Sequence, residues 1–365
     1  MKELKKSDWL RAALVALMLL ALCLLVSSPT LGEKAKLELD QTVPGFPPIP
    51  ENWTVIPAAE ALTSEQVTRY GTAQPQLMVY NDKTHTWEAS DTPATVSKYD
   101  WKRYEDGSIS VRSEFSSLKP AQKKKVVPAA IVYIKIADPS QIRTAMSYDD
   151  YKKKAYTSAE KMSAHVNAVA AINGDFFKYH YDVGYVLRQG VFYRDKLNGK
   201  RDVLLIDSNG DFHAILGAVT ADIDACIAGL PEGVTAINTF SLGPVLVQDG
   251  AARVMKETVT AKNGEFQWKY AQQRVAVVQT GELEYALVET YGKTDGSCGL
   301  TLQEFSDYIA FCFPDCRVAY NLDGGGSSNV LIDSERIHTT PGHREICDIL
   351  YFASAGDWEV AEDGN

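Results

Sequence analysis

The sequence predicts an α+β protein: a β-sheet core with flanking helices, preceded by a transmembrane helix and a proline-rich spacer. After about residue 104, short apolar and β-branched segments alternate with turns containing Gly, Asn or Asp, a pattern typical of strands. Convincing helical spacing occurs in two segments of this part, residues 158–168 and 301–311. The first 100 residues differ in character, because an apolar run is followed there by a stretch rich in proline.

An apolar segment near the N-terminus predicts membrane targeting. Residues 10–26 are apolar apart from Arg11, and Lys2, Lys5 and Lys6 precede them. A run of roughly 17 residues is near the lower limit for a spanning helix and is longer than a usual signal-peptide core. We expect a retained signal-anchor, with a cleaved signal peptide as the alternative. Because positive charge stays on the cytosolic side, the bulk of the chain is expected outside the cytoplasm, either at the cell membrane or secreted.

Four segments are expected along the chain. Residues 1–28 form the cytosolic basic end and the signal-anchor, and residues 29–103 form an extracytoplasmic spacer, with a small subdomain as the alternative. Prolines stiffen the first part of this spacer, at Pro44, Pro47, Pro48, Pro50 and Pro57. Residues 104–358 form the main domain, and residues 359–365 an acidic tail.

Charge and cysteine content narrow the classes of partner and site. The chain carries 37 basic and 47 acidic residues, and its net charge of -10 argues against nucleic acid as a partner. Cysteines outside the membrane segment are odd in number, so they cannot all pair within one chain: Cys226, Cys298, Cys312, Cys316 and Cys347. The spacing of Cys312 and Cys316 is compatible with a small disulfide loop or with two free thiols after a helix.

The segment NLDGGGSS at residues 321–328 follows an apolar run, which predicts a short buried strand that ends in a glycine turn. Consecutive glycines permit positive φ and a close approach of the backbone to a ligand. Their N–H groups can form a concavity for anions, to which serine hydroxyls add donors. Asp323 is a candidate acid, base or metal ligand. The predicted substrate-binding residues here are Asn321, Gly324, Gly325, Gly326, Ser327 and Ser328.

The tetrapeptide Asn-Gly-Asp-Phe occurs twice, and its two settings predict different roles. The copy at residues 209–212 lies between two apolar strands, where Asn-Gly is the expected hairpin turn. The copy at residues 173–176 follows a buried-looking strand and continues into aromatic and polar residues as far as Tyr181. Such a series is typical of a sugar-binding rim, with an exposed loop as the alternative. Asn173, Gly174 and Asp175 are therefore further site candidates.

Arg274 stands at the start of an otherwise apolar strand. The planar guanidinium matches the oxygens of a carboxylate or phosphate, so Arg274 is a candidate for phosphate binding. A structural ion pair is the alternative interpretation.

Four stretches, taken in order, resemble the phosphodiester glycosidase family. They are residues 173–177, residues 243–246 with 249–250, Arg274 with Ala276, and residues 321–328 with Arg344. The resemblance covers about residues 104–354. It implies an α+β domain with a mixed, twisted sheet that hydrolyses the bond between a sugar's anomeric carbon and a phosphodiester. Bacterial members of the family are often linked to exopolysaccharide or cell-wall metabolism.

Two segments depart from the family pattern. Residues 273–276 read QRVA where the family usually has PRTA, so the arginine is kept and its neighbours are not. Residues 290–293 read TYGK where many relatives have VDGR, which removes an acid and replaces an arginine by lysine.

The resemblance and the residues lead to one mechanistic hypothesis. Cleavage at an anomeric carbon passes through an oxocarbenium-like state that carboxylates stabilise, and Asp175 and Asp323 are the predicted catalytic pair. Arg274, Arg344 and the N–H groups of the glycine turn are predicted to neutralise the phosphate. The sequence does not divide acid, base and nucleophile between the two aspartates. A divalent cation held by both is an alternative.

Three functions fit these features. The first is hydrolysis of sugar-1-phosphodiesters, with a phosphorylated carbohydrate or cell-wall glycan as substrate and the membrane as a partner of the N-terminal helix. The second is a tethered, non-catalytic receptor for anionic cell-wall glycans. The third is a phosphoesterase or phosphotransferase that cleaves the P–O bond. The first requires that the loop after Ile172 and the loop after Leu322 converge in one pocket.

Overall fold

The computed structural model describes residues 67–73, 76–91, 99–121, 125–153, 155–175, 184–262, 268–292, 299–338 and 342–356. The predicted membrane anchor and the prolines of the spacer lie outside these ranges. Within them, no helix is both long enough and apolar enough to cross a membrane. The description below concerns this part of the chain.

The largest sheet has eleven strands, and most of them follow the order β1-β4-β5-β6-β17-β16-β18-β14-β15. Neighbours in this order pair antiparallel. β2 pairs antiparallel with β3 and parallel with β5, so the sheet is mixed, as predicted. The strands are β1 (Val67–Ala73), β2 (Gln76–Asn81), β3 (Thr86–Ala89), β4 (Tyr99–Glu105), β5 (Ile109–Lys119), β6 (Val127–Ile136), β14 (Val245–Gln248), β15 (Ala251–Ala252), β16 (Arg274–Gly281), β17 (Glu284–Thr290) and β18 (Val318–Asn321).

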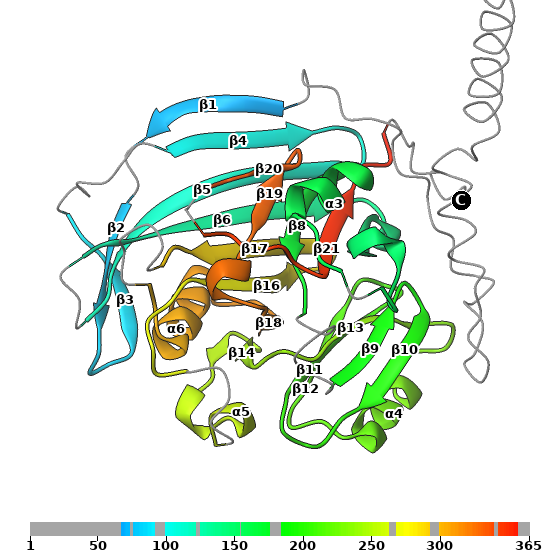
Figure 1. The fold of residues 1–365 in the computed structure, drawn as a ribbon. Helices are drawn as coiled ribbons and strands as arrows, with labels where there is room; N and C mark the ends of the chain where they lie inside the picture. Colours follow the sequence, from blue (N-terminus) through cyan, green and yellow to red (C-terminus); the bar gives the residue numbers. More distant parts are fainter. Residues whose placement is uncertain are drawn as a thin grey trace, which may run out of the picture. The chain divides into compact units, whose positions relative to one another are not determined.

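A five-stranded antiparallel sheet packs on one face of the large sheet (Figure 1). Its order is β20-β19-β8-β21-β7, with β7 (Ile142–Met146), β8 (Ala168–Asn173), β19 (Val330–Ile332), β20 (Glu335–Arg336) and β21 (Asp348–Ala353). β8 and β21 are buried along their whole length, which explains why both read as continuous apolar runs rather than alternating ones. The main core of the molecule lies between the two sheets.

Helices cover the outer faces of these layers. α3 (Ala159–His165) packs on the five-stranded sheet through Met162, and α6 (Leu302–Cys312) packs on the opposite face of the large sheet through Phe305 and Ile309. Short helical segments complete the chain: η1 (Pro139–Gln141), η2 (Ser147–Asp149), η3 (Met255–Glu257), α5 (Val259–Lys262) and η5 (Gly325–Ser327).

A third group of elements lies beside the two sheets. The hairpin β9 (Gly184–Arg188) and β10 (Val191–Lys196) lies beside the three-stranded sheet β12-β11-β13, at the lower right of Figure 1. Its strands are β11 (Val203–Asp207), β12 (Phe212–Ile215) and β13 (Ala236–Phe240), and α4 (Thr220–Ala228) packs on them through Ile223.

Both predicted helices form with the predicted caps. The Ser158 side chain accepts a hydrogen bond from the Lys161 N–H, and Thr301 forms a capping box with Glu304. The first helix ends earlier than expected, at His165, because Asn167 takes a left-handed conformation with φ 50° that stops the helix before β8. The predicted β-rich α+β class is confirmed.

Two further findings concern the predicted domain boundary and the cysteines. β4 spans Tyr99–Glu105 and pairs with β5, so the large sheet extends across the boundary expected after residue 103. The rest of the predicted domain division remains a prediction. Cys312 and Cys316 are free thiols, as are Cys226 and Cys347, so the disulfide interpretation of that pair is wrong.

Candidate active site

The two loops that carry Asp175 and Asp323 meet. Both aspartates line one small, partly open pocket with a cavity volume of about 10 Å³, which is room for about one water molecule. Its other walls are Asn173, Gly174, Ile346, Cys347 and Asp348. β8 belongs to the five-stranded sheet and β18 to the large one, so the pocket lies where strands of the two sheets end.

Asn173 joins the two loops. Its Nδ2 donates to the carbonyl oxygen of Asp323 at 2.8 Å, and its Oδ1 accepts from the N–H of Asn329 at 2.9 Å. The backbone N–H of Asn173 also donates to the Asn329 carbonyl at 3.2 Å. Both ends of the buried amide therefore contact the neighbouring loop, so Asn173 positions the two loops. Its contact with substrate remains a prediction.

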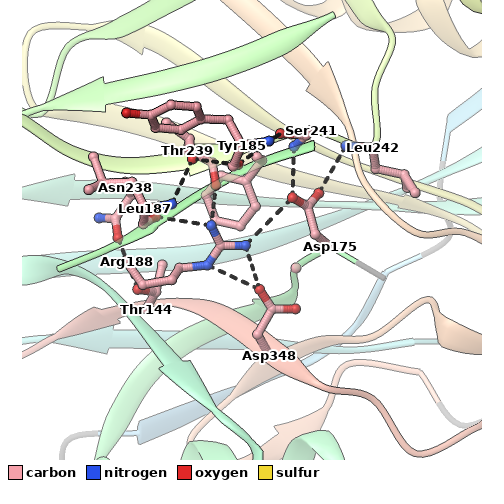
Figure 2. Close-up of polar contacts among 12 residues, drawn as sticks. Thr144, Asp175, Tyr185, Leu187, Arg188, Asn238, Thr239, Ser241, Leu242 and Asp348 are labelled. Carbon is pink, nitrogen blue, oxygen red and sulfur yellow. Dashed lines mark hydrogen bonds and ion pairs between the residues drawn. The ribbon is translucent and has the colours of Figure 1, made fainter. Parts of the chain in front are cut away.

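Asp175 is held rigidly. Its Oδ2 accepts from the N–H of Ser241 at 2.7 Å and its Oδ1 from the N–H of Leu242 at 3.1 Å (Figure 2). The side chain is 5% exposed, and burial raises its pKa, although Arg188 and the two N–H groups favour the charged form. A fixed carboxylate of this kind stabilises positive charge that develops close to it.

Arg188 lies between two buried carboxylates, as Figure 2 shows. Its Nη2 is 2.8 Å from Asp348 Oδ2 and 3.5 Å from Asp175 Oδ2, and its Nε donates to Asp348 at 3.3 Å. Nη1 donates to the carbonyls of Thr239 and Leu187. Burial disfavours the guanidinium charge, but the two aspartates outweigh burial and raise the pKa of Arg188.

Asp348 is a third acid on the pocket wall. Burial raises its pKa to about 6, Arg188 opposes this rise, and the charge of Asp175 adds to it. Arg188 and Asp348 were not predicted from the sequence. The sequence feature that could have identified them is a single charged residue at one end of an apolar strand. The same feature made Arg274 a candidate.

Glycine is required at position 174 because the Asp348 side chain lies against the backbone there. A Cβ at this position would lie 2.5 Å from Asp348 Oδ2 and 2.6 Å from its Cγ. The Gly174 N–H also donates to the Asp348 carbonyl at 3.0 Å. Any side chain here would displace the acid that pairs with Arg188.

The glycine turn lies against the start of β16. The N–H of Gly325, which has φ 63°, donates to the Gln273 carbonyl at 2.9 Å, so this donor stabilises the turn. Anion binding by the turn remains a prediction. A Cβ at Gly324 would lie 2.7 Å from the same oxygen. A Cβ at Gly326 would lie 3.1 Å from Arg344 Nε. Gly324 and Gly326 thus serve close packing, and Gly325 serves the positive φ of the turn.

Asp323 is half-buried at the start of this turn. Burial raises its pKa, whereas the Ser327 hydroxyl and the charge of Arg344 lower it and the charge of Asp175 raises it further. Ser328 is fully buried behind the turn. Asn321 donates from Nδ2 to the Gly243 carbonyl at 2.8 Å and so attaches the end of β18 to the Gly243-Pro244 turn.

The two predicted arginines have different surroundings. Arg344 is exposed, and its N–H donates to the Gly326 carbonyl at 2.7 Å, which places it beside Asp323. Arg274 is buried and donates to the carbonyls of Leu300 and Tyr270 at 3.3 and 2.9 Å. Burial lowers the pKa of Arg274 to about 9. Arg274 is absent from the pocket wall, and its contact with phosphate remains a prediction.

Two other predictions concern metal and sugar binding. No cluster of three or more His, Cys, Asp or Glu side chains suited to a metal ion occurs among the residues that the structure describes. The predicted aromatic rim, residues 176–181, lies outside the described ranges.

These features define a β-rich α+β domain with a carboxylate-lined pocket between two sheets. A family model described as phosphodiester glycosidase matches residues 166–353, which is more than half of the 365-residue chain. The chain belongs to the phosphodiester glycosidase family, a family of hydrolases. The family expected from four short stretches is thereby confirmed.

The fold resembles that of a solved structure at low sequence identity. The catalytic domain of zebrafish N-acetylglucosamine-1-phosphodiester alpha-N-acetylglucosaminidase, auto-inhibited by its pro-peptide, is 14% identical, with a TM-score of 0.54 over 79% of this chain and 88% of that one. A hypothetical protein from Synechocystis is also 14% identical, with a TM-score of 0.47 over 73% of this chain and 65% of that one. No curated protein sequence matches this chain.

Proposed function

We propose that this protein hydrolyses the glycosidic C–O bond of sugar-1-phosphodiesters outside the cytoplasm, in cell-wall or exopolysaccharide metabolism. Membership in the phosphodiester glycosidase family supports the reaction class. The observation that carries the proposal is that Asp175 and Asp323, from loops distant in sequence, line the same pocket. Departure of a leaving group from an anomeric carbon requires two carboxylates at one site.

The surroundings of the two acids suggest a division of roles. Asp175 is fixed by two backbone N–H groups and lies beside Arg188, so we assign it to stabilising the positive charge on the sugar, as nucleophile or as counter-charge. Asp323 is half-buried with a raised pKa and a nearby hydroxyl, which suits a group that transfers a proton. Arg344 is exposed beside Asp323 and is assigned to the phosphate.

The test is hydrolysis by the purified full-length chain in ¹⁸O-labelled water, with a panel of sugar-1-phosphodiesters. The proposal expects the label in the sugar hemiacetal, since water attacks the anomeric carbon. Label in the phosphate would mean P–O cleavage and would refute the proposed mechanism. Binding of a panel member without turnover would favour a receptor for anionic glycans.

The proposed location has a separate test. Cys226 is a free, half-buried thiol in α4, away from the pocket wall. In intact cells of the native host, a membrane-impermeant maleimide should label the wild-type chain, and this labelling should fall in the Cys226→Ser variant. Labelling of Cys226 that occurs only after cell lysis would contradict an extracytoplasmic location.

A further inference from the structure

Asn329 is a buried residue that contacts both loops of the candidate active site. Its N–H donates to Asn173 Oδ1 at 2.9 Å, and its carbonyl accepts from the Asn173 N–H at 3.2 Å. Its Nδ2 donates to the Ser327 carbonyl at 2.7 Å. Asn173 lies two residues before Asp175, and the Ser327 hydroxyl donates to the Asp323 carboxylate. Asn329 therefore joins the segments that carry the two acids.

Arg336 fixes the orientation of the Asn329 side-chain amide. Its Nε donates to Asn329 Oδ1 at 2.6 Å. A guanidinium has only donors, so the amide oxygen must face it. The amide nitrogen then faces the Ser327 carbonyl, which is an acceptor. A rotated amide would place donors together at Arg336 and acceptors together at Ser327. The charged partner thus selects the one orientation that holds the glycine turn.

A tight hairpin places Arg336 beside Asn329. The hairpin joins β19 to β20 through the two residues Asp333 and Ser334, whose φ values of 53° and 57° are both positive, as a two-residue turn of type I′ requires. So short a turn fixes the register, in which Arg336 lies opposite Leu331. Asn329 is two residues before Leu331, so its side chain and that of Arg336 share one face of the hairpin.

Two carboxylates keep the Arg336 guanidinium in place. Glu160 of α3 lies 3.1 Å from Nε through Oε1 and accepts from Nη2 at 3.2 Å through Oε2. Burial lowers the pKa of Arg336, whereas the charges of Glu160 and of buried Glu289 raise it. The Arg336 side chain is 14% exposed and is absent from the pocket wall. Its route to the site is therefore the contact with Asn329.

We propose that Arg336 is a positioning residue of the active site: through Asn329 it sets the spacing of Asp175 and Asp323. The inference rests on the proposed function, because the spacing of two carboxylates determines how a bond at an anomeric carbon is cleaved. Reacting groups that are displaced by about 1 Å lose roughly 10²-fold in rate. Arg336 acts without contact with the substrate.

The first experiment is steady-state kinetics of the full-length chain on a sugar-1-phosphodiester. Arg336→Met keeps the length of the side chain and removes its donors. It should lower kcat by about 10²-fold and leave KM within about threefold, because substrate binding does not involve Arg336. Arg317→Met is the matched control, since Arg317 also pairs with an acid, Asp211, but near the surface and away from the pocket wall. Its kcat should stay within about twofold of wild type. Equal losses in the two variants would overturn the proposal.

A second variant covers the case in which Arg336→Met does not fold. Arg336→Lys keeps the positive charge that Glu160 and Glu289 face, but a flexible ammonium does not hold the amide as a planar guanidinium does. Its kcat should still fall by about tenfold. A wild-type kcat in folded Arg336→Lys would count against the proposal.

Combining Arg336→Met with Asn329→Ala separates positioning from a general loss of structure. If Arg336 acts through Asn329, replacing it should cost little once Asn329 is gone, so the kcat of the double variant should lie within about threefold of that of Asn329→Ala. A double variant slower by the full product of the two single losses would show that Arg336 acts by another route.

Crystal structures of wild type and Arg336→Met give a measurement that needs no turnover. The distance between the carboxylates of Asp175 and Asp323 should change by about 1 Å, and an unchanged distance would overturn the inference. A changed distance in a protein whose wild type cleaves no sugar-1-phosphodiester would uphold the positioning and refute the proposed function. Cleavage by wild type with an unaltered kcat in Arg336→Met would do the reverse.

Discussion

The tetrapeptide Asn-Gly-Asp-Phe occurs twice in this chain, and the two copies differ in almost every contact. In the second copy, Gly210 has φ 80° and forms the hairpin turn between β11 and β12. Asn209 is exposed there, and Asp211 pairs with Arg317 at 2.5 Å near the surface. That copy is a turn, and its acid takes part in a surface ion pair.

Residues 173–175 of the first copy are buried, and their partners come from distant parts of the chain. Asn173 contacts the loop that follows β18, and Asp175 accepts hydrogen bonds from Ser241 and Leu242. Gly174 has an ordinary φ and is needed because Asp348 lies against it. Identical residues thus have the proposed chemical role in one place and a conformational role in the other, because their long-range packing differs.

The largest expected difference between the copies is in turnover. Asp175→Asn should reduce kcat for a sugar-1-phosphodiester by about 10³-fold or more, because a charge that stabilises the transition state is lost. Asp211→Asn is the matched control and should stay within about twofold, since a surface ion pair contributes little. Steady-state kinetics on both variants checks this, and equal losses would remove the distinction between the copies.

The next difference is in the glycines. Gly174→Ala should lower kcat by about 10²-fold, because the methyl group displaces Asp348 and with it Arg188. Gly210→Ala should lower stability instead, since φ is 80° and a Cβ would lie 2.4 Å from the Tyr285 hydroxyl. Its kcat, measured well below the melting temperature, should remain near wild type. A full loss of activity in folded Gly210→Ala would contradict the comparison.

The asparagines should differ in stability. Asn173→Ala removes two side-chain hydrogen bonds between loops and leaves buried backbone groups unsatisfied, at a cost of about 2–3 kcal/mol. Asn209→Ala changes an exposed side chain and should stay within about 0.5 kcal/mol of wild type. Urea unfolding of the two variants measures both values. A cost for Asn173→Ala no larger than that for Asn209→Ala would mean that the loops are held by other contacts.

The smallest expected effect concerns pH. The pKa of Asp348 is raised from its ordinary value of 3.8 to about 6, so the folded state binds this proton more tightly than the unfolded state does. Wild-type stability relative to Asp348→Asn should therefore fall as pH rises from about 4 to about 6, by at most about 1.4 kcal/mol per pH unit, and then level off. Unfolding curves at pH 4, 5, 6 and 7 check the sign. Asp348→Asn should be the more stable protein at pH 7, and a less stable variant would mean that the ion pair with Arg188 outweighs burial.

Local signals in the sequence predicted the parts of the structure that depend on neighbours along the chain. Ser158 and Thr301 cap helices because their hydroxyls reach N–H groups three residues away. The Asn209-Gly210 hairpin follows from the same kind of local geometry. The strands before Asp175 and Asp323 were also predictable, because buried strands read as apolar runs.

The polar contacts of the pocket were less predictable, because they depend on strand pairing. Arg188 and Arg274 look alike in sequence, each a single arginine at the end of an apolar strand. Only Arg188 lies between carboxylates, whereas Arg274 donates to the carbonyls of Tyr270 and Leu300. The pairing of β21 with β8 brings Asp348 next to Gly174, and no local pattern specifies that register. The pairing of β4 with the large sheet was not predicted for the same reason, because no local pattern specifies it.

The central claim is that Asp175 and Asp323 act as one unit, and a double-mutant cycle on kcat/KM tests it most directly. The measurement compares Asp175→Asn, Asp323→Asn and the double variant with wild type on one sugar-1-phosphodiester. Residues that act together lose activity non-additively, so the double variant should be within about threefold of the slower single variant. Losses that multiply would show that the two aspartates act independently and would contradict a shared catalytic pocket.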